Sequence, residues 1–499
     1  MENNKPNDCN ETEIDDLITG KCVKEDVNLS MDSSLTYRTN SVQSLSDGSN
    51  LGLEVVWHNV RYVVQKKSLH KSKVQTVELI RNASGRGVGG KVTALLGPSG
   101  CGKTTLLECI AGLRSVGLTG HIYVTSGPKT RIAFCPQKDH HLEQLSVKET
   151  LLFATKLKNY NKNDNKTEKW DSKAHHRVVD NVLKQLGLDS CAKVRVSACS
   201  GGQRKRLSIG IELVNRPNIL FLDEPTSGLD SSSCLQCIKL LQHLSRGSDT
   251  MEPMVIIASI HQPSAQVLNR IDYLYIMSNG GRPIYFGPTN QLTNTISSYG
   301  LSCPMYETPT EFVVGIASGD QGINIIERMA FNQMERSGYF HDVPDESTSV
   351  AKIVQKSKRR SHPFFLHIWQ LLLRTNLCIW RQPQLTALRL FTSIAIAIMI
   401  SFIYVNPIGR SSGCMETILL EFDIMRPMGD CLSNLGFVFF SLLFIALSAK
   451  MPTILTFPLE MNVFLRERAN GWYSCGAYYI AKSIADIPYQ VSTQYINQK

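Results

Sequence analysis

The residue types best suited to chemistry stand together in one glycine-rich segment of the chain. The segment matches the pattern GxxxxGK[ST], and it lies between an apolar run at 92–96 and a helix-like sequence after it. Glycines let the backbone curl so that successive N–H groups point inward, and the following helix adds the positive end of its dipole. Such a cradle suits the phosphates of a nucleotide. We therefore predict an ATP-binding loop made by Gly97, Pro98, Ser99, Gly100, Cys101, Gly102, Lys103, Thr104 and Thr105.

Two side chains of this loop have separate predicted roles. Lys103 would reach the β- and γ-phosphates as a point charge, and the hydroxyl of Thr104 would ligate Mg²⁺. ATP and Mg²⁺ are therefore the expected cofactors. The alternative is a glycine-rich turn that binds no ligand, and the motifs further along the chain weigh against it.

Two carboxylates follow an apolar run of the kind that is buried on both faces of a parallel sheet. The run covers 219–222, and Asp223 and Glu224 come directly after it. Open α/β sheets bind ligands at the carboxyl ends of their strands, so both acids are expected at the nucleotide. Asp223 suits coordination of Mg²⁺, and Glu224 suits orienting and deprotonating the attacking water. Asp230 follows in a tight turn and is also expected to contact ATP.

An amide and an imidazole also stand directly after short apolar runs. Gln137 follows the run 132–136 and could ligate Mg²⁺ or a water through its carbonyl oxygen, unless it is a solvent-facing loop residue. His261 follows the run 255–260 and could contact the γ-phosphate or stabilise the transition state, although a single histidine at a strand end is often structural. The predicted catalytic residues are Glu224, His261 and Gln137, and the predicted metal ligands are Thr104, Gln137 and Asp223.

A second helix start with a hydroxyl and two glycines follows at Ser200, Gly201, Gly202 and Gln203. It predicts another anion-binding helix N-terminus. One nucleotide does not need two such sites far apart in the same chain. We therefore predict that these four residues close on ATP held by a partner chain. A simple N-cap is the alternative, although two glycines are an unusual choice if capping were the only role.

Alternating apolar residues from Leu53 to Val64 predict a strand. Tyr62 in this strand could stack on the adenine ring and so belong to the ATP site. The alternative is a tyrosine in the core or on the surface of the strand.

The charge of the chain is concentrated late in the sequence. The 499 residues include 53 Lys and Arg against 43 Asp and Glu, a net charge of +10. Much of the excess lies between Lys352 and Arg389, before and at the first long apolar segment, which indicates a cytosolic membrane flank. Nucleic-acid binding by 356–360 is the alternative, but no aromatic platform accompanies these cations, so no nucleic-acid partner is expected. The 14 cysteines show no repeating metal-ligand spacing.

The C-terminal part carries long apolar segments. Residues 363–381 predict an amphipathic helix that lies in the membrane interface. Residues 385–405 can span about 30 Å of hydrocarbon. Residues 433–457 can do so if the helix continues through Lys450, which would either snorkel to the cytosol or line a substrate path.

The remaining segments are polar. Residues 1–50 have the composition of a disordered tail and show no signal peptide, so the N-terminus is expected in the cytosol. The loop 406–432 is expected on the other side of the membrane, where Cys414 and Cys431 could form a disulfide.

In order and spacing, these motifs are similar to those of an ATP-binding cassette. They look like the Walker A motif (97–104), the Q-loop (137), the signature (200–203), the Walker B motif with D-loop (222–230) and the switch histidine (261). The tail Arg204-Lys205-Arg206, the string 261–264 and the segment 280–288 resemble the G (White-type) subfamily of ABC transporters, in which the cassette precedes the membrane domain. Cys199 and Gln203 depart from the commoner Val and Glu of that subfamily.

The resemblance implies the fold class and the domains. It implies an α/β P-loop NTPase cassette at 51–300, a linker at 301–362, and then an α-helical transmembrane region. It also implies that 477–491 is the start of a third membrane helix that is cut short. It also implies a multi-pass protein of the plasma membrane or an internal membrane. The likeness stops near Ser492, so the chain is expected to be a C-terminally truncated form or a fragment.

The same resemblance implies an activity and partners. A half-transporter of this subfamily would pair as a homodimer or heterodimer, hydrolyse ATP, and export a hydrophobic small molecule, a lipid or sterol above all, in contact with membrane lipid. One alternative is a truncated isoform that transports nothing and regulates full-length halves by pairing with them. A soluble cassette ATPase is another alternative, and the fused apolar segments argue against it.

Overall fold

The computed structural model describes residues 53–67, 74–125, 130–159, 171–247, 252–305, 307–337, 348–349, 363–403 and 425–498. All of them fall in one compact unit of the chain, 37–499. The predicted tail at 1–50 lies outside the described residues, and so does Cys414 of the predicted disulfide.

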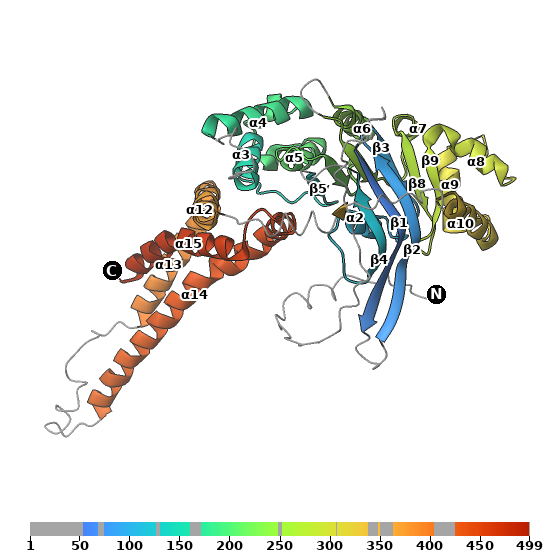
Figure 1. Cartoon of the computed structure of the whole chain (residues 1–499). Coiled ribbons are helices and arrows are strands. Elements are labelled where there is room, and N and C mark those ends of the chain that lie inside the picture. Colours follow the sequence, from blue (N-terminus) through green and yellow to red (C-terminus); the bar gives the residue numbers. More distant parts are fainter. Residues whose placement is uncertain are drawn as a thin grey trace. The chain divides into compact units, whose positions relative to one another are not determined.

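A six-stranded sheet with the order β5-β6-β7-β3-β8-β9 forms the centre of the N-terminal part (Figure 1). Its first five strands in this order are parallel, and β9 runs antiparallel to β8. The strands are short apolar runs with almost fully buried residues, as expected of a sheet that is covered on both faces. Their bounds are β3 Val92–Leu96, β5 Ile132–Cys135, β6 Ile219–Leu222, β7 Val255–Ser259, β8 Tyr273–Met277 and β9 Pro283–Pro288.

A second, antiparallel sheet has the order β10-β4-β1-β2. Its core meets the first sheet where Trp57 packs on Tyr275, with ring centroids 5.6 Å apart. Gly85 permits this approach, because a Cβ there would lie 2.7 Å from the Trp57 ring. The strand bounds are β1 Glu54–Lys67, β2 Val74–Val88, β4 Leu118–Val124 and β10 Thr348–Ser349.

Helices cover both faces of the central sheet, and a separate group of three helices, α3 to α5, packs together beside it (Figure 1). Gly210 of α5 allows this close packing, since a Cβ there would lie 2.6 Å from Leu186 of α4. The bounds are α2 Lys103–Ile110, α3 Val147–Lys158, α4 Ser172–Leu186, α5 Gly201–Leu213, α6 Ser231–Arg246, α7 Ala265–Leu268 and α8 Leu292–Ser298.

The predicted linker at 301–362 begins too early. Helices α9 (Pro309–Ser318) and α10 (Ile323–Ser337) pack against β8, β9 and β2, and Val313 and Met329 are buried in the main core. The first folded part therefore extends at least to residue 337, because these helices have an apolar face that the sheet covers.

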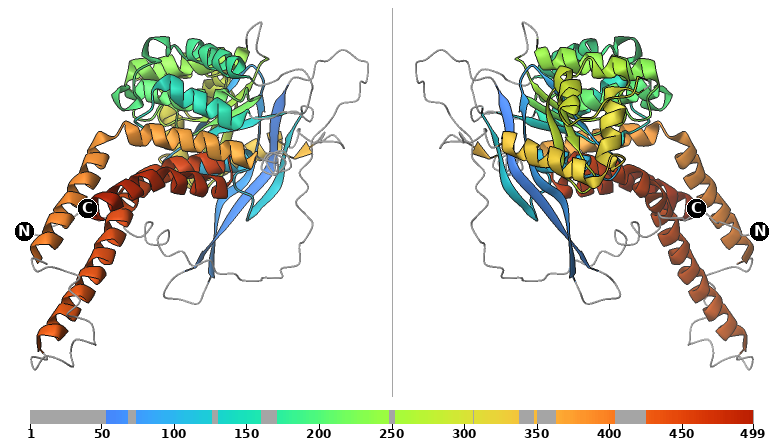
Figure 2. Two further views of the ribbon diagram at one scale, coloured as in Figure 1. Left: turned by 90° about the vertical axis from the view of Figure 1, so that its left-hand side faces the viewer. Right: turned by 90° about the vertical axis from the view of Figure 1, so that its right-hand side faces the viewer.

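Four further helices follow: α12 Phe364–Trp380, α13 Pro383–Ile403, α14 Met425–Ala469 and α15 Cys475–Gln498. Both views of Figure 2 show α13 beside α14, and α12 packs on α15. The predicted loop 406–432 is too long, since helix already begins at residue 425, and α14 continues without a break through Lys450. Across the residues described here, no helix is both long and apolar enough to cross a membrane.

Candidate functional site

Four neighbouring strands bring the residues singled out in the sequence to one edge of the central sheet. β5, β6, β7 and β3 are adjacent and parallel, so the loops that follow them start on the same side. Those loops carry Gln137, the pair Asp223 and Glu224, His261, and the glycine-rich loop 97–102. This is the edge at which open α/β sheets bind their ligands. The topology thus gathers the phosphate-binding, metal-binding and catalytic candidates.

The glycine-rich loop has a backbone path that requires glycine. Gly97 has a φ of 146°, and a Cβ there would lie 2.4 Å from the main-chain oxygen of Met277. Gly102 has a φ of 100° and precedes α2 as its N-cap residue, without any side-chain cap. The first N–H groups of α2 are therefore available to an anion.

Lys103 folds back over this loop. Its Nζ donates to the main-chain oxygens of Gly97 and Pro98, at 2.9 Å each. The residue is only 6% exposed. The loop thus holds a cation at the place where it is predicted to hold phosphates, which fits the role expected for Lys103.

Thr104, Asp223 and Ser259 share one set of hydrogen bonds. Thr104 Oγ1 donates to Asp223 Oδ1 at 3.0 Å, and Ser259 Oγ donates to the same oxygen at 2.7 Å. Ser259 Oγ also accepts from the main-chain N–H of Glu224 at 2.8 Å. Hydroxyl and carboxylate oxygens are the ligands that Mg²⁺ prefers, so Thr104 and Asp223 fit the predicted metal. Sequence reasoning missed Ser259, because it ends an apolar strand and carries no motif of its own.

Gln137 and Glu224 meet directly. Gln137 Nε2 donates to Glu224 Oε2 across 2.6 Å. Glu224 has a φ of 44°, a conformation that costs a residue with a side chain about 1–3 kcal/mol and that is concentrated at functional sites. The amide nitrogen of Gln137 faces the carboxylate here, so metal ligation by its carbonyl oxygen stays a prediction. His261 is exposed just beyond β7, and its contact with a γ-phosphate also stays a prediction.

The residues 200–203 form the first turn of α5. Ser200 caps the helix: its Oγ accepts from Gln203 N at 3.3 Å, while Gln203 Oε1 accepts from Ser200 N at 3.0 Å. This is the capping alternative from the sequence, and Gln203 completes a capping box. Gly202 has a second reason to lack a side chain, because a Cβ would lie 3.0 Å from Ser233 Oγ. Closure on a partner's ATP remains a prediction.

Asp230 is the N-cap residue of α6. Its Oδ2 accepts from Ser232 Oγ at 2.6 Å and from the main-chain N–H of Ser233 at 3.1 Å. The hydrogen bonds from Ser232 and Ser233 lower the pKa of this carboxyl. The structure therefore gives Asp230 a capping role, and contact with ATP stays a prediction.

Tyr62 requires a correction. It is 7% exposed and lies in the hydrophobic core between β1, β2 and the central sheet, opposite Leu118 of β4. The side chain is buried in this core, because the strand turns this side of β1 inward. The burial is the core alternative from the sequence and speaks against stacking on adenine, so we assign Tyr62 no part in nucleotide binding.

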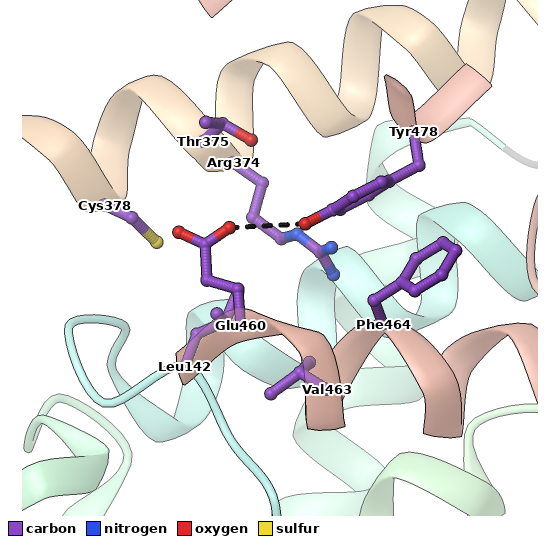
Figure 3. A pocket seen from close by; sticks show the side chains of 8 residues that line it. All are labelled: Leu142, Arg374, Thr375, Cys378, Glu460, Val463, Phe464 and Tyr478. Atoms are coloured by element: carbon purple, nitrogen blue, oxygen red, sulfur yellow. Dashed lines mark hydrogen bonds between the residues drawn. The ribbon is translucent and has the colours of Figure 1, made fainter. Parts of the chain in front are cut away.

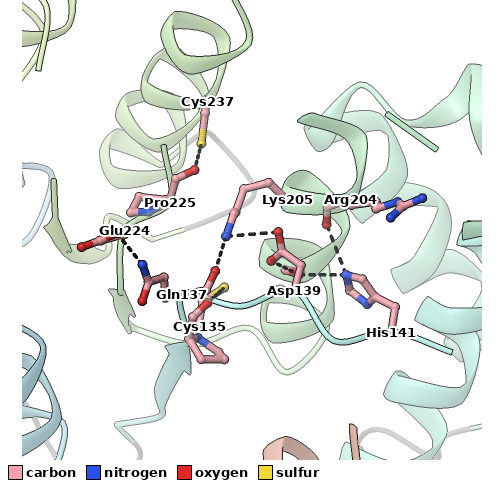
Figure 4. A network of polar contacts seen from close by, with 11 residues as sticks. Cys135, Gln137, Asp139, His141, Arg204, Lys205, Glu224, Pro225 and Cys237 are labelled. Carbon is pink, nitrogen blue, oxygen red and sulfur yellow. Dashed lines mark hydrogen bonds and ion pairs between the residues drawn. The ribbon is translucent and has the colours of Figure 1, made fainter. Parts of the chain in front are cut away.

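A buried polar network behind Gln137 was also missed. Lys205 of α5 reaches the main-chain oxygen of Gln137 and the carboxylate of Asp139, and His141 completes the network (Figure 4). The Arg-Lys-Arg tail after the signature was noted in the sequence. Its middle residue gives no sequence signal that it faces inward, because lysine is usually exposed.

Arg381 links the first folded part to the C-terminal helices. It follows α12, and its guanidinium forms two bonds with Glu149 of α3, at 2.6 and 2.7 Å. A third bond goes to the main-chain oxygen of Gln144 at 3.1 Å. The hydrogen bonds from Arg381 lower the pKa of Glu149 to about 2. Such a forked pair fixes orientation as well as distance.

The turn between α14 and α15 makes a second link. Asn470 Nδ2 donates to Glu212 Oε1 of α5 at 3.1 Å and lies 3.4 Å from the main-chain oxygen of Phe134, at the end of β5. Glu212 is paired with Lys158 at 2.7 Å, and the Lys158 ammonium sits 4.5 Å from the ring centroid of Trp472. Both charged side chains are nearly fully buried. The turn therefore contacts the helix that begins with the signature and the strand that leads to Gln137.

A third ion pair lies within the C-terminal helices. Arg374 of α12 bonds Glu467 of α14 at 2.6 and 2.9 Å, and the Tyr473 hydroxyl donates to the same carboxylate. A small pocket beside it has a volume of about 10 Å³, which is no more than one water needs (Figure 3). This pocket is too small for an organic substrate. Its lining residues are Leu142, Arg374, Thr375, Cys378, Glu460, Val463, Phe464 and Tyr478.

Comparison with known families agrees with this arrangement. Residues 80–227 match the family described as ABC transporter, and residues 367–495 match the family described as ABC-2 type transporter. The chain therefore carries two domains of ABC transporter families. The first match includes the glycine-rich loop, Gln137, the signature and Glu224, and the second includes α12 to α15. The α/β ATPase cassette expected from the sequence is thereby confirmed.

Individual relatives belong to the G family. The chain is 28% identical over 463 residues to ABC transporter G family member 7 of Arabidopsis thaliana, and 30% identical over 462 residues to member 22 of that plant. Each match covers 87% of this chain, which spans 59% of the length of these relatives. A solved nucleotide-free cassette from an ABC transporter is 22% identical, with a TM-score of 0.39 over 49% of this chain and 95% of the other.

Proposed function

We propose that this ABC transporter chain is an ATP hydrolase that acts as half of a dimeric exporter of a hydrophobic substrate, with a lipid or sterol as the first candidate. One observation carries the proposal. The residues proposed to bind and hydrolyse a nucleotide meet at one sheet edge. Behind them, β5 and α5 contact Asn470, and α3 contacts Arg381, so the same part of the chain also touches the C-terminal helices.

The chain's own residues divide the hydrolytic work. The 97–102 loop and Lys103 hold the phosphates, while Thr104 and Asp223 hold Mg²⁺, which neutralises charge on the phosphates when bound. Glu224 orients the attacking water and accepts its proton, and Gln137 keeps the Glu224 carboxylate in place through the 2.6 Å hydrogen bond. His261, exposed at the same edge, donates to the γ-phosphate.

Dimerisation completes each site. Ser200 to Gln203 of one chain close on the nucleotide held by Lys103 of the other, because the N-terminus of α5 offers N–H groups and a positive dipole end. Closure of the two cassettes then moves α3 and α5. Arg381 and Asn470 pass that movement to α12 and to the turn after α14.

Substrate export requires that the apolar helices cross a membrane. We propose that the apolar segments predicted from the sequence, 385–405 and 433–457, do so, with the N-terminus in the cytosol and with α12 in the interface. The exposed aromatic side chains Phe365, Trp369 and Trp380 of α12 support this placement of α12.

The test uses the full chain in two steps. Carbonate extraction of expressed membranes should leave the chain in the pellet, and release into the supernatant would rule out an integral exporter. The detergent-purified chain should hydrolyse ATP in the presence of Mg²⁺, whereas Glu224→Gln should not. Vesicles that contain the chain alone should then export a labelled sterol or phospholipid in an ATP-dependent manner. Hydrolysis without export would favour the regulatory isoform over the exporter.

A further inference from the structure

Lys205 has no part in the function proposed above, although it lies on α5 two positions after the signature. We propose that Lys205 is a positioning residue of the hydrolytic site: it fixes Gln137, and thereby the contact of Gln137 with Glu224, and ties both to α5. The inference rests on the proposed ATP hydrolysis, and its test below separates the two.

The contact itself is short and buried. Lys205 Nζ donates to the main-chain oxygen of Gln137 at 2.8 Å and lies 3.1 Å from Asp139 Oδ2. Lys205 is only 2% exposed. Burying an ammonium costs several kcal/mol unless a carboxylate and hydrogen-bond acceptors compensate, and both are present here. The buried Lys205 ammonium is therefore compensated by two specific partners, the Gln137 oxygen and the Asp139 carboxylate.

Two more residues of α5 hold the same segment. Ser208 Oγ donates to Asp139 Oδ1 at 2.6 Å, and His141 Nε2 lies 2.9 Å from Ser208 Oγ and 3.3 Å from the main-chain oxygen of Arg204. Gln137 contacts α5 through its main-chain oxygen, whereas Asp139 and His141 contact it through their side chains (Figure 4). The segment 137–141 is thus fastened to α5 at every second residue.

The charges of this network are settled by its environment. Burial and the nearby Arg466 cation lower the pKa of His141 to about 3, so the imidazole is neutral at physiological pH. Because Ser208 donates its proton to Asp139, the proton of His141 must be on Nε2, where it faces the Ser208 and Arg204 oxygens. Asp139 therefore carries the only negative charge among the contacts of the Lys205 ammonium, and the pair is balanced.

The position of Lys205 joins two nucleotide sites. The first turn of α5 is proposed to meet the partner's nucleotide, and Lys205 lies about one turn further along the same helix. At the other end of the contact, Gln137 holds Glu224 at 2.6 Å. A shift of α5 when the partner's nucleotide binds therefore moves Gln137 and changes the position of the Glu224 carboxylate. Hydrolysis at one site would respond to occupancy of the other.

The test compares Lys205→Met, Gln137→Ala and the double variant in the purified full chain. Lys205→Met should lower kcat for ATP about 10- to 100-fold, as expected for a misplaced catalytic group, while KM for ATP stays close to that of wild type. The double variant should be no slower than Gln137→Ala, since Lys205 acts through the contact of the Gln137 side chain with Glu224, and Gln137→Ala already removes that contact. Independent losses that multiply in the double variant would overturn the proposal.

A matched control separates positioning from general damage. Lys148 of α3 pairs with Asp180 of α4 at 2.7 Å, away from the nucleotide residues, so Lys148→Met removes a Lys–Asp pair and should leave kcat unchanged. If Lys205→Met fails to fold, Lys205→Gln replaces it. That side chain keeps a donor for the Gln137 oxygen, and it should recover part of kcat.

A second readout does not depend on hydrolysis. Amide hydrogen exchange of 137–141 should be faster in Lys205→Met than in wild type, whereas exchange at 148–158 should not change. If wild type hydrolyses no ATP but this difference appears, the proposed function fails and the mechanical link stands. Unchanged exchange at 137–141 would overturn the inference even in an active enzyme.

Discussion

Gln137 Nε2 and Glu224 Oε2 lie 2.6 Å apart, so an amide from the loop after β5 holds the carboxylate that follows β6. Glu224 is further fixed by its main-chain N–H, which donates to Ser259 Oγ at 2.8 Å. A general base acts only when its oxygen stands within hydrogen-bond reach of the water that it deprotonates. The two hydrogen bonds fix the position of Glu224, the proposed general base.

The change Glu224→Gln should keep ATP binding and abolish turnover. The amide has nearly the same shape but cannot accept a proton, and loss of a general base costs about 10²- to 10⁴-fold. Titration of the purified chain with a fluorescent ATP analogue, alongside phosphate release, gives both quantities. Asp180→Asn, a carboxylate-to-amide change on α4, serves as the control and should leave turnover unchanged. Unchanged hydrolysis in Glu224→Gln would refute the assignment of the base.

The change Lys103→Ala should weaken nucleotide binding. A hydrogen bond to a charged group contributes about 1.5–3 kcal/mol, which corresponds to about 10- to 150-fold in affinity. Lys91→Ala is a matched control, because Lys91 stands just before β3, is half exposed, and pairs with Asp272 at 3.5 Å. Equal affinities in wild type and Lys103→Ala would contradict the phosphate-binding role. Because Lys103 is buried, a thermal-unfolding scan checks that the Lys103→Ala variant still folds.

Much of this site was readable from the sequence, because its chemistry depends on residue type and order. The pattern at 97–104 and the acids after the run 219–222 identify a nucleotide site before any fold is known. The parallel sheet then explains why segments so distant in the chain meet. The end of the first folded part could not be predicted: α9 lies in the predicted linker, because its apolar face is recognisable only beside the sheet that covers it.

The burial of some single residues could not be predicted from the sequence, for one physical reason. Tyr62 and Lys205 each have a polar end and an apolar stem, and either type can face inward or outward. Only the side of the strand or helix on which they fall decides this, and the sequence of one chain does not fix that side. Ser259 and Asp139 were missed for a related reason: their roles come from a hydrogen bond and an ion pair with residues 36 and 66 positions away.

The Arg381–Glu149 pair should couple hydrolysis to export. In Arg381→Met, the cassette should still hydrolyse ATP, whereas ATP-dependent substrate export in vesicles should fall, because α12 loses both forked bonds to α3. The pair is partly exposed, so its contribution to stability is expected to be about 1 kcal/mol or less. An unchanged ratio of substrate exported to ATP hydrolysed would count against this coupling role.

The same pair predicts a pH dependence. Hydrogen bonds from Arg381 first, and also from Ser146, lower the pKa of Glu149 from 4.5 to about 2 in the folded state, so the folded protein holds the carboxylate in its charged form more strongly than the unfolded chain does. The contribution to stability is therefore complete above about pH 4.5 and is lost as the pH falls towards 2. The difference in unfolding temperature between wild type and Arg381→Met should shrink over that range. A difference that is independent of pH would contradict the assignment.

Loss of the buried ion pair of Arg374 and Glu467 should reduce stability much more than loss of the partly exposed pair of Arg381 and Glu149. Arg374→Met leaves a carboxylate buried and short of its partner, and breaking such a pair costs about 3–5 kcal/mol. Burial and the Glu467 carboxylate raise the pKa of Tyr473, so its hydroxyl keeps its proton and one donor to Glu467 remains. Adding Glu467→Gln removes the stranded charge, so the double variant should recover much of the loss. Protease resistance of α12 and α15 measures this, with ATP hydrolysis as the readout for an intact cassette. If the double variant is as sensitive as Arg374→Met, the loss comes from packing of the arginine stem and not from the unpaired charge.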